Sequence, residues 1–195
     1  MRILPEDPVK RGRVQLLLIV AVFALPLVGS GLAFFLGWST GKTSNYGDLI
    51  EPRAVPSAVL TALDGRVVRL GELRGKWILL QFDAAACDAG CERKLYILRQ
   101  VRKALGRDQT RVERVWIVPG TATPAPRLLA AIEGTRVLRP VSPGFATAFP
   151  AMQSVREHIY LIDPRGNLIL RFPRDPDPSK VIKDLRRLLT YSAMG

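Results

Sequence analysis

The stretch KWILLQFDAAACDAGCERKLYILRQVRKALG, residues 76–106, contains both cysteines of the chain, Cys87 and Cys91. Its first part, residues 76–82, is a short and mostly apolar run, which is typical of a strand buried on both faces. From residue 92 onward, apolar residues recur every three or four positions, which indicates an amphipathic helix with Gly106 as its stop. The two thiols are therefore predicted to lie where a buried strand ends and its helix begins.

A second strand and a second helix follow this pair along the chain. Residues 111–120 form another mostly apolar run. After that run, Thr123 is placed to cap a helix that Pro124 opens and Gly134 closes. Together the two pairs give the order strand, helix, strand, helix, which predicts a βαβ unit with parallel strands.

Two hairpins and a last helix complete the predicted α/β domain. Asp64-Gly65 lies between two apolar runs and favours a two-residue hairpin turn. In residues 163–166 the second and fourth positions are Pro and Gly, which favours a type I turn between two further strands. Asp177 and Pro178 predict the start of a helix with one apolar stripe. The pattern as a whole indicates a central mixed sheet with helices on its faces.

The amino-terminal part of the chain contains a segment of membrane-spanning length. No charged residue occurs from Val14 to Trp38, and about 20 apolar residues suffice to cross a bilayer. A cleaved signal peptide is the alternative, but its apolar region is shorter, about 7–15 residues. Basic residues precede the segment, among them Lys10, Arg11 and Arg13, whereas Lys42 is the first charge after it. This bias predicts a cytoplasmic amino terminus and an external carboxy-terminal domain.

These features divide the chain into four predicted parts. In a bacterial cell the anchor would lie in the inner membrane and the domain in the periplasm, where cysteine pairs oxidise readily. The predicted parts are a cytoplasmic tail over 1–13, a transmembrane helix over 14–38, a linker rich in Ser, Thr, Gly and Pro over 39–57, and the folded domain over 58–195.

The chain is strongly basic, with a formal net charge of +12 at pH 7. Such a charge is compatible with nucleic-acid binding. However, the basic residues are scattered through helical patterns, and an external membrane-anchored domain would not meet nucleic acid. We therefore expect no nucleic-acid partner. The charge favours anionic lipid or an acidic partner protein, and the alternative is a solvated basic surface without a partner.

The spacing of the two cysteines suits thiol chemistry. A helix start stabilises an anion, so a thiol there has a lowered pKa and more reactive thiolate. Residues four apart lie on one face of a helical turn, where two sulfurs can form a disulfide or bind one soft metal ion. We expect an exposed turn in which both sulfurs can reach the same atom, either a copper ion or a sulfur of another protein. The alternative is an inert disulfide, although closing so short a loop contributes little stability.

Two cysteines alone do not complete a zinc or iron–sulfur site, which leaves copper(I) as the metal that two or three soft ligands can hold. A third ligand would have to be His158, the only histidine in the chain, or a methionine such as Met152.

With these features the chain resembles the SCO/SenC family of thioredoxin-like, membrane-anchored assembly proteins for the copper site of cytochrome c oxidase. The resemblance covers the anchor and residues 59–189. It rests on the three-residue spacing between Cys87 and Cys91, on Phe82 five residues before the first cysteine, and on YLIDPRGNLILRFP, residues 160–173. It implies a thioredoxin-like sheet flanked by helices. It also implies that the two thiols and a distal histidine, for which His158 is the candidate, bind copper.

The resemblance also implies a function. We expect a periplasmic, membrane-anchored protein that assists oxidase assembly by reducing a partner's disulfide, by delivering copper(I) through Cys87 and Cys91, or by both. The partner would be an oxidase subunit or another copper-assembly protein. As a thiol–disulfide oxidoreductase, the chain would attack with Cys87 and resolve with Cys91. The alternative is a scaffold of the assembly machinery that uses neither redox chemistry nor metal.

Overall fold

The computed structural model describes residues 8–36 and 45–192 of the chain. The first seven residues of the predicted tail, the end of the predicted membrane helix and the first part of the predicted linker lie outside the described residues. The chain forms two compact units, residues 1–44 and residues 45–195.

The first unit contains helix α1, Pro8–Phe35. Its part from Arg11 to Phe35 contains an 18-residue window with a mean hydropathy of 2.5 and no buried residues, and it is long and apolar enough to cross a membrane. Pro26 lies inside the helix, a position that a membrane-spanning helix tolerates. The single amino-terminal apolar helix that the sequence predicts is therefore present.

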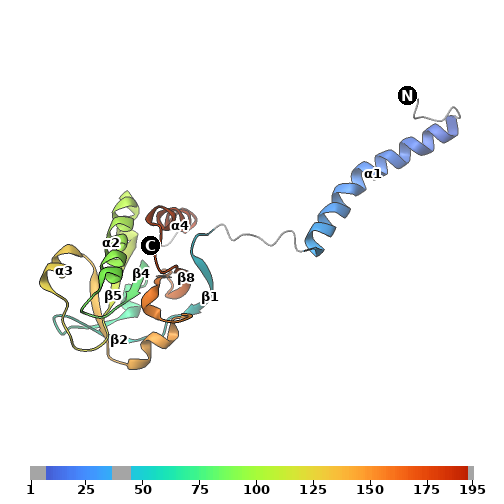
Figure 1. Ribbon diagram of the computed structural model, residues 1–195. Coiled ribbons are helices and arrows are strands. Elements are labelled where there is room, and N and C mark those ends of the chain that lie inside the picture. Colours follow the sequence, from blue (N-terminus) through green and yellow to red (C-terminus); the bar gives the residue numbers. More distant parts are fainter. Residues whose placement is uncertain (1–7, 37–44, 193–195) are drawn as a thin grey trace. The chain divides into compact units, whose positions relative to one another are not determined.

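The second unit is built on one eight-stranded sheet with strand order β1-β8-β7-β4-β5-β6-β2-β3 (Figure 1). The central strands β4, β5 and β6 are parallel, and every other neighbouring pair is antiparallel. The strands are β1 Asp48–Ala54, β2 Val59–Ala62, β3 Val67–Arg69, β4 Trp77–Phe82, β5 Val112–Ile117, β6 Arg136–Pro140, β7 Ile159–Ile162 and β8 Asn167–Phe172. The helices are α2 Ala89–Ala104, α3 Pro126–Ala131 and α4 Pro178–Tyr191. The predicted mixed sheet flanked by helices is thus confirmed.

Strand β4 is buried at every position and separates two apolar cores. Ile78, Leu80 and Phe82 belong to the core on one face, which includes a short 3-10 helix, Pro143–Ala148. The alternate residue Leu79 belongs to the core on the other face, together with apolar residues of α2 and α4. Because side chains alternate along a strand, Gln81 points to the same face as Leu79, the face that α2 covers.

Two strands were not predicted from the sequence. Asp48–Ala54, inside the segment predicted as a linker, form the edge strand β1, whose side chains are almost all exposed and therefore show no apolar alternation. Its pairing with β8 is irregular between Leu49 and Arg53. The short strand β6 has charged or half-buried residues at both ends, which conceals its two buried positions.

Two predicted details differ from the structure. The hairpin at Asp64-Gly65 forms, but its loop has three residues, because Ala62 N donates to Arg66 O and Gly65 takes a positive φ. The third helix begins at Pro126, with Ala125 as its cap, whereas Thr123 and Pro124 were predicted to begin it. The reason is that both prolines are compatible with a first helical turn, and the sequence does not distinguish them.

Candidate functional site

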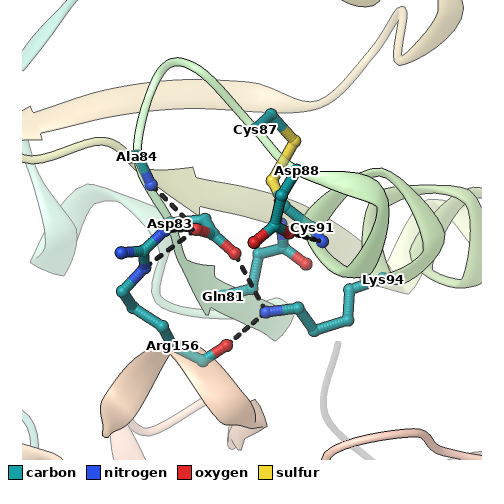
Figure 2. The surroundings of a disulfide bond; sticks show 8 residues. All are labelled: Gln81, Asp83, Ala84, Cys87, Asp88, Cys91, Lys94 and Arg156. Carbon is teal, nitrogen blue, oxygen red and sulfur yellow. Dashed lines mark hydrogen bonds and ion pairs between the residues drawn. A yellow bond between two sulfur atoms is a disulfide. The ribbon is translucent and has the colours of Figure 1, made fainter.

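The two cysteines lie in the loop between β4 and α2 and at the first turn of α2, as predicted (Figure 2). They form a disulfide with an S–S distance of 2.02 Å and a Cα–Cα distance of 5.2 Å. Asp88 caps the helix, because its Oδ1 accepts a hydrogen bond of 2.8 Å from Cys91 N. Cys87 has a φ of 33°, and among the described residues it is the only one other than glycine with a positive φ. The backbone thus turns sharply at Cys87 so that its sulfur reaches the helix.

The prediction of an exposed turn is wrong for this disulfide. Cys91 is fully buried and Cys87 is 7% exposed. Both pack in an apolar cluster that includes Leu95 and Trp116, so the helix and the sheet close over the sulfurs. The order of exposure still agrees with the prediction that Cys87 meets a partner first.

Gln81 lies directly behind the buried sulfur. Its side chain is fully buried, and its Nε2 lies 3.9 Å from Cys91 Sγ, at the limit for a hydrogen bond to sulfur. Its Oε1 has no hydrogen-bond partner among the described residues. A buried amide with an unused acceptor is costly, so this group is a candidate for a role at the disulfide.

A buried ion cluster lies on the same side of the disulfide. Lys94 Nζ lies 3.1 Å from Asp83 Oδ2, and both side chains are almost fully buried. Arg156 donates to Asp83 Oδ1 through Nε at 2.9 Å, and its backbone carbonyl accepts a hydrogen bond from Lys94 Nζ. Figure 2 shows Gln81, Asp83, Lys94 and Arg156 gathered beside Cys91, with Cys87 on the far side of the loop. One carboxylate and two cations give this cluster a net charge of +1.

The cluster opens into a hollow of about 490 Å³ that Cys91 also lines. Two further ion pairs stand at its rim: Arg93 lies 2.6 Å from Asp175, and Arg174 lies 3.5 Å from Glu157. The hollow beside Cys91 is therefore lined by charged groups of both signs.

A second hollow, of about 330 Å³, lies beside Cys87. Small residues such as Ala86 and Ala122 line it, together with Leu128. Its charged lining residues are Glu92 and Arg127. A partner chain that approaches Cys87 would thus meet a mostly small and apolar surface.

The carboxylate nearest the helix start acts on the sulfurs in two ways. The hydrogen bond from Cys91 N holds the pKa of Asp88 below its usual range, so this carboxylate is charged at neutral pH. Its charge opposes a thiolate nearby, whereas the dipole of α2 and the cations of the buried cluster favour one.

His158 does not join the cysteines in this structure. It ends the 3-10 helix Val155–Glu157, and its Nδ1 lies 2.9 Å from Phe172 O. No group of three or more His, Cys, Asp or Glu side chains able to hold a metal ion occurs within residues 8–36 and 45–192. Met152 is 90% exposed. Arg156, two residues before His158, takes the place beside Cys91 instead, because strand β7 begins only at Ile159 and the preceding turn directs the arginine inward.

Three residues of the site escaped the sequence analysis. Gln81 is a polar residue inside an apolar run, and Asp83 follows that run directly. Both could therefore have been recognised in the sequence as candidate site residues. Arg156 carried no such signal, because its approach depends on a turn 65 residues after Cys91 in the chain. Lys94 follows Cys91 by three positions, one helical turn, but its charge gave no reason to expect burial.

Comparisons with known proteins agree with this fold. Residues 77–192 match the model of a family described as transmembrane-like, thioredoxin-like, C-terminal domain. No curated protein matches the chain.

The similar solved structures include Sco proteins, in agreement with the resemblance seen in the sequence. Bradyrhizobium japonicum ScoI with copper bound is 23% identical, with a TM-score of 0.55 over 69% of this chain and 99% of that one. Yeast Sco1 with copper bound is 16% identical, with a TM-score of 0.62 over 74% and 97%. BsSco, described with a disulfide switch and as a member of the Sco family of cytochrome c oxidase assembly proteins, is 19% identical, with a TM-score of 0.53 over 76% and 96%.

Proposed function

The chain belongs to the transmembrane-like, thioredoxin-like family, and on that premise we propose that it is a membrane-anchored protein that exchanges its disulfide with a partner. The observation that carries this proposal is the Cys87–Cys91 disulfide at the start of α2. Only three residues separate the cysteines, so the bond contributes little to stability through chain entropy. A bond of little structural value, in a thioredoxin-like loop, fits a chemical role better than a structural one.

The exchange starts from the reduced chain. The Cys87 thiolate attacks one sulfur of the partner's disulfide, a mixed disulfide forms, and the partner's other sulfur leaves as a thiolate that takes a proton. Cys91 then attacks Cys87 Sγ and releases the partner's second thiolate. Two electrons pass to the partner, whose disulfide becomes two thiols, and the Cys87–Cys91 disulfide forms. Cys87 has the attacking role because it is the less buried sulfur and lines a hollow with mostly small and apolar residues.

We place this exchange in the assembly of cytochrome c oxidase. Support comes from the motif resemblance and from BsSco, which is described as a member of a family of oxidase assembly proteins. The partner would then be an oxidase subunit or another copper-assembly protein. The basic residues before α1 support a cytoplasmic amino terminus and a periplasmic domain in a bacterial inner membrane.

Copper(I) delivery by a site of two cysteines and one histidine does not fit the residues as they are arranged. His158 bonds to Phe172 O and does not group with the cysteines, and the cations Lys94 and Arg156 lie beside Cys91. Copper would be a cargo here, and we derive no step through it. We expect copper(I) titration of the reduced protein to give the same affinity before and after His158→Ala. Loss of tight binding in His158→Ala would instead support a copper site formed by two cysteines and one histidine.

The exchange is tested by trapping. The full chain with Cys91→Ser is expressed in cells that assemble the oxidase, and mixed disulfides are identified on non-reducing gels. We expect a trapped partner with Cys91→Ser and at least tenfold less with the matched variant Cys87→Ser, because the resolving thiol is lost only in the first. If both cysteines can be changed to serine without loss of oxidase assembly, the protein is a scaffold and the proposal is wrong.

A further inference from the structure

Helix α4 presents a basic surface to solvent. Four exposed cations, Lys180, Lys183, Arg186 and Arg187, form what we call the basic face of α4. Positions 180, 183 and 187 repeat every three or four residues, so they lie along one side of the helix. The helix has one acidic residue, Asp184, which is 4% exposed. The exposed side of α4 is therefore positive from Lys180 to Arg187.

The buried acid of α4 fixes the point at which the chain enters the domain. Asp184 Oδ2 accepts hydrogen bonds from Tyr46 N at 2.9 Å and from Gly47 N at 3.0 Å. A Cβ at Gly47 would lie 2.0 Å from Leu170 Cδ2, so the fit is tight. Lys180 Nζ lies 5.1 Å from the centre of the Tyr46 ring. The first residues of the second unit thus lie against α4, beside Lys180, the first residue of the basic face.

Chain length then limits how far the basic face can be from a membrane that holds α1. Helix α1 ends at Phe35, and a chain of the ten residues between Phe35 and Tyr46 spans at most about 35 Å. Tyr191, at the end of α4, is 84% exposed, and tyrosine is enriched at membrane interfaces.

We propose that the basic face of α4 binds the anionic headgroups of the membrane in which α1 is anchored. Each lysine or arginine near an anionic membrane surface raises the binding constant roughly fivefold. An acidic protein offers similar charges, but nothing in the chain ties such a protein to α4, whereas the segment leading from α1 does. Docking would hold the domain at the membrane and restrict the directions from which a partner can reach Cys87.

The test uses the full chain in nanodiscs. A fluorophore is attached at Thr190→Cys, an exposed position of α4, without reductant so that the native disulfide stays closed. Quenching by a headgroup spin label is compared between phosphatidylcholine discs and discs with an equal part of phosphatidylglycerol. We expect stronger quenching on the anionic discs, and its loss at high salt, because salt screens exposed charges.

Charge-neutralising variants assign the effect to α4. Changing Lys180, Lys183 and Arg187 to Gln should lower the docked-to-undocked ratio by roughly a hundredfold, and Lys183→Gln alone by roughly fivefold. The control changes Arg66, Arg69 and Arg127, exposed cations outside α4, to Gln and should leave quenching unchanged.

The remaining outcomes are decisive. Equal quenching on neutral and anionic discs overturns the proposal. If the discs cause no difference but soluble polyglutamate changes the fluorescence of the label, the basic face binds an acidic protein and the proposal is wrong. A chain that is not retained in the discs would show instead that the proposed membrane anchoring is wrong. That outcome is separate, because the disulfide exchange is measured by trapping.

Discussion

The two sulfurs of one disulfide lie in opposite surroundings. On the Cys91 side the domain places a buried amide, a buried ion cluster and a charged hollow. On the Cys87 side it places a hollow lined mostly by small and apolar residues. The difference indicates a division of labour. In the proposed exchange a partner meets Cys87, whereas groups of the domain surround Cys91 and set its charge environment and hydrogen bonding.

The largest test of this comparison concerns the buried ion pair. In Asp83→Asn the buried Lys94 ammonium loses its carboxylate, and removal of one partner from a buried pair costs about 3–5 kcal/mol. We expect the free energy of unfolding of the oxidised full chain in detergent to fall by about 3 kcal/mol. This is the lower end of the range, because Arg156, the other cation bound to Asp83, is half exposed and water can solvate it when the carboxylate is lost. Denaturant titration measures it.

The matched control lies at the rim of the same hollow. Arg93 and Asp175 are closer, at 2.6 Å, but both side chains are about two thirds exposed. We therefore expect Asp175→Asn to cost less than about 0.5 kcal/mol. Equal effects of the two substitutions would mean that burial of the ion pair beside Cys91 does not strengthen its contribution to stability.

The second test concerns the amide behind Cys91. In the disulfide state Gln81 turns Nε2 toward Cys91 Sγ, and its Oε1 has no partner among the described residues. A reduced Cys91 has an S–H group that donates to Oε1 once the side-chain amide rotates to bring this oxygen to Sγ. Gln81 therefore favours the reduced state, by an amount comparable to one unsatisfied buried group, about 1–3 kcal/mol. We expect Gln81→Met to make the disulfide about tenfold harder to reduce in glutathione buffers.

Leu79→Met is the control for this second test, because Leu79 lies two residues earlier on the same face of β4. Thiol alkylation of the full chain at equilibrium measures both variants. Gln81→Asn, which keeps the amide but withdraws it, should lie between Gln81→Met and the unaltered chain. If Gln81→Met matches the unaltered chain while the disulfide still exchanges with glutathione, the amide has no role but the proposed function stands.

The sequence predicted one side of this comparison better than the other. The junction of β4 and α2 follows from an apolar run and a helical period, which are local signals. The cysteine spacing is local as well. The burial of Cys91 and the approach of Arg156 are not, because they depend on how distant segments pack over the loop. The place of His158 was missed for the same reason, since a few residues in a turn before β7 decide which side chain faces the sulfurs.

The edges of the sheet show the same limit. Strand β1 is held by backbone hydrogen bonds to β8 and by the contact of Tyr46 and Gly47 with Asp184. Its exposed side chains resemble those of a linker, so composition alone assigned it to one. Pairing with a partner strand far along the chain made it a strand.

The smallest predicted effect concerns Asp88, the carboxylate that follows Cys87 in the chain and caps α2. Asp88 caps α2 through Cys91 N, and loss of such a cap costs about 1 kcal/mol. We expect Asp88→Ala to lower the free energy of unfolding by about that amount at neutral pH, and Asp88→Ser, which retains a cap, to lower it less. Thr123→Ala, a change on the Cys87 side, should stay within about 0.5 kcal/mol.

The pH dependence of the Asp88 cap identifies the charge as its source. The pKa of Asp88 lies below its ordinary value of 3.8, because Cys91 N donates to the ionised carboxylate. A lowered pKa in the folded state means that this stabilisation is complete above the ordinary value and is lost as the pH falls through the lowered one. Denaturant titrations in acid should therefore bring the unaltered chain and Asp88→Ala together, whereas the serine cap keeps its contribution. A gap between the unaltered chain and Asp88→Ala that persists in acid would show that the side chain acts through packing, and the polar character assigned to the Cys91 side would then rest on Gln81 and the ion cluster alone.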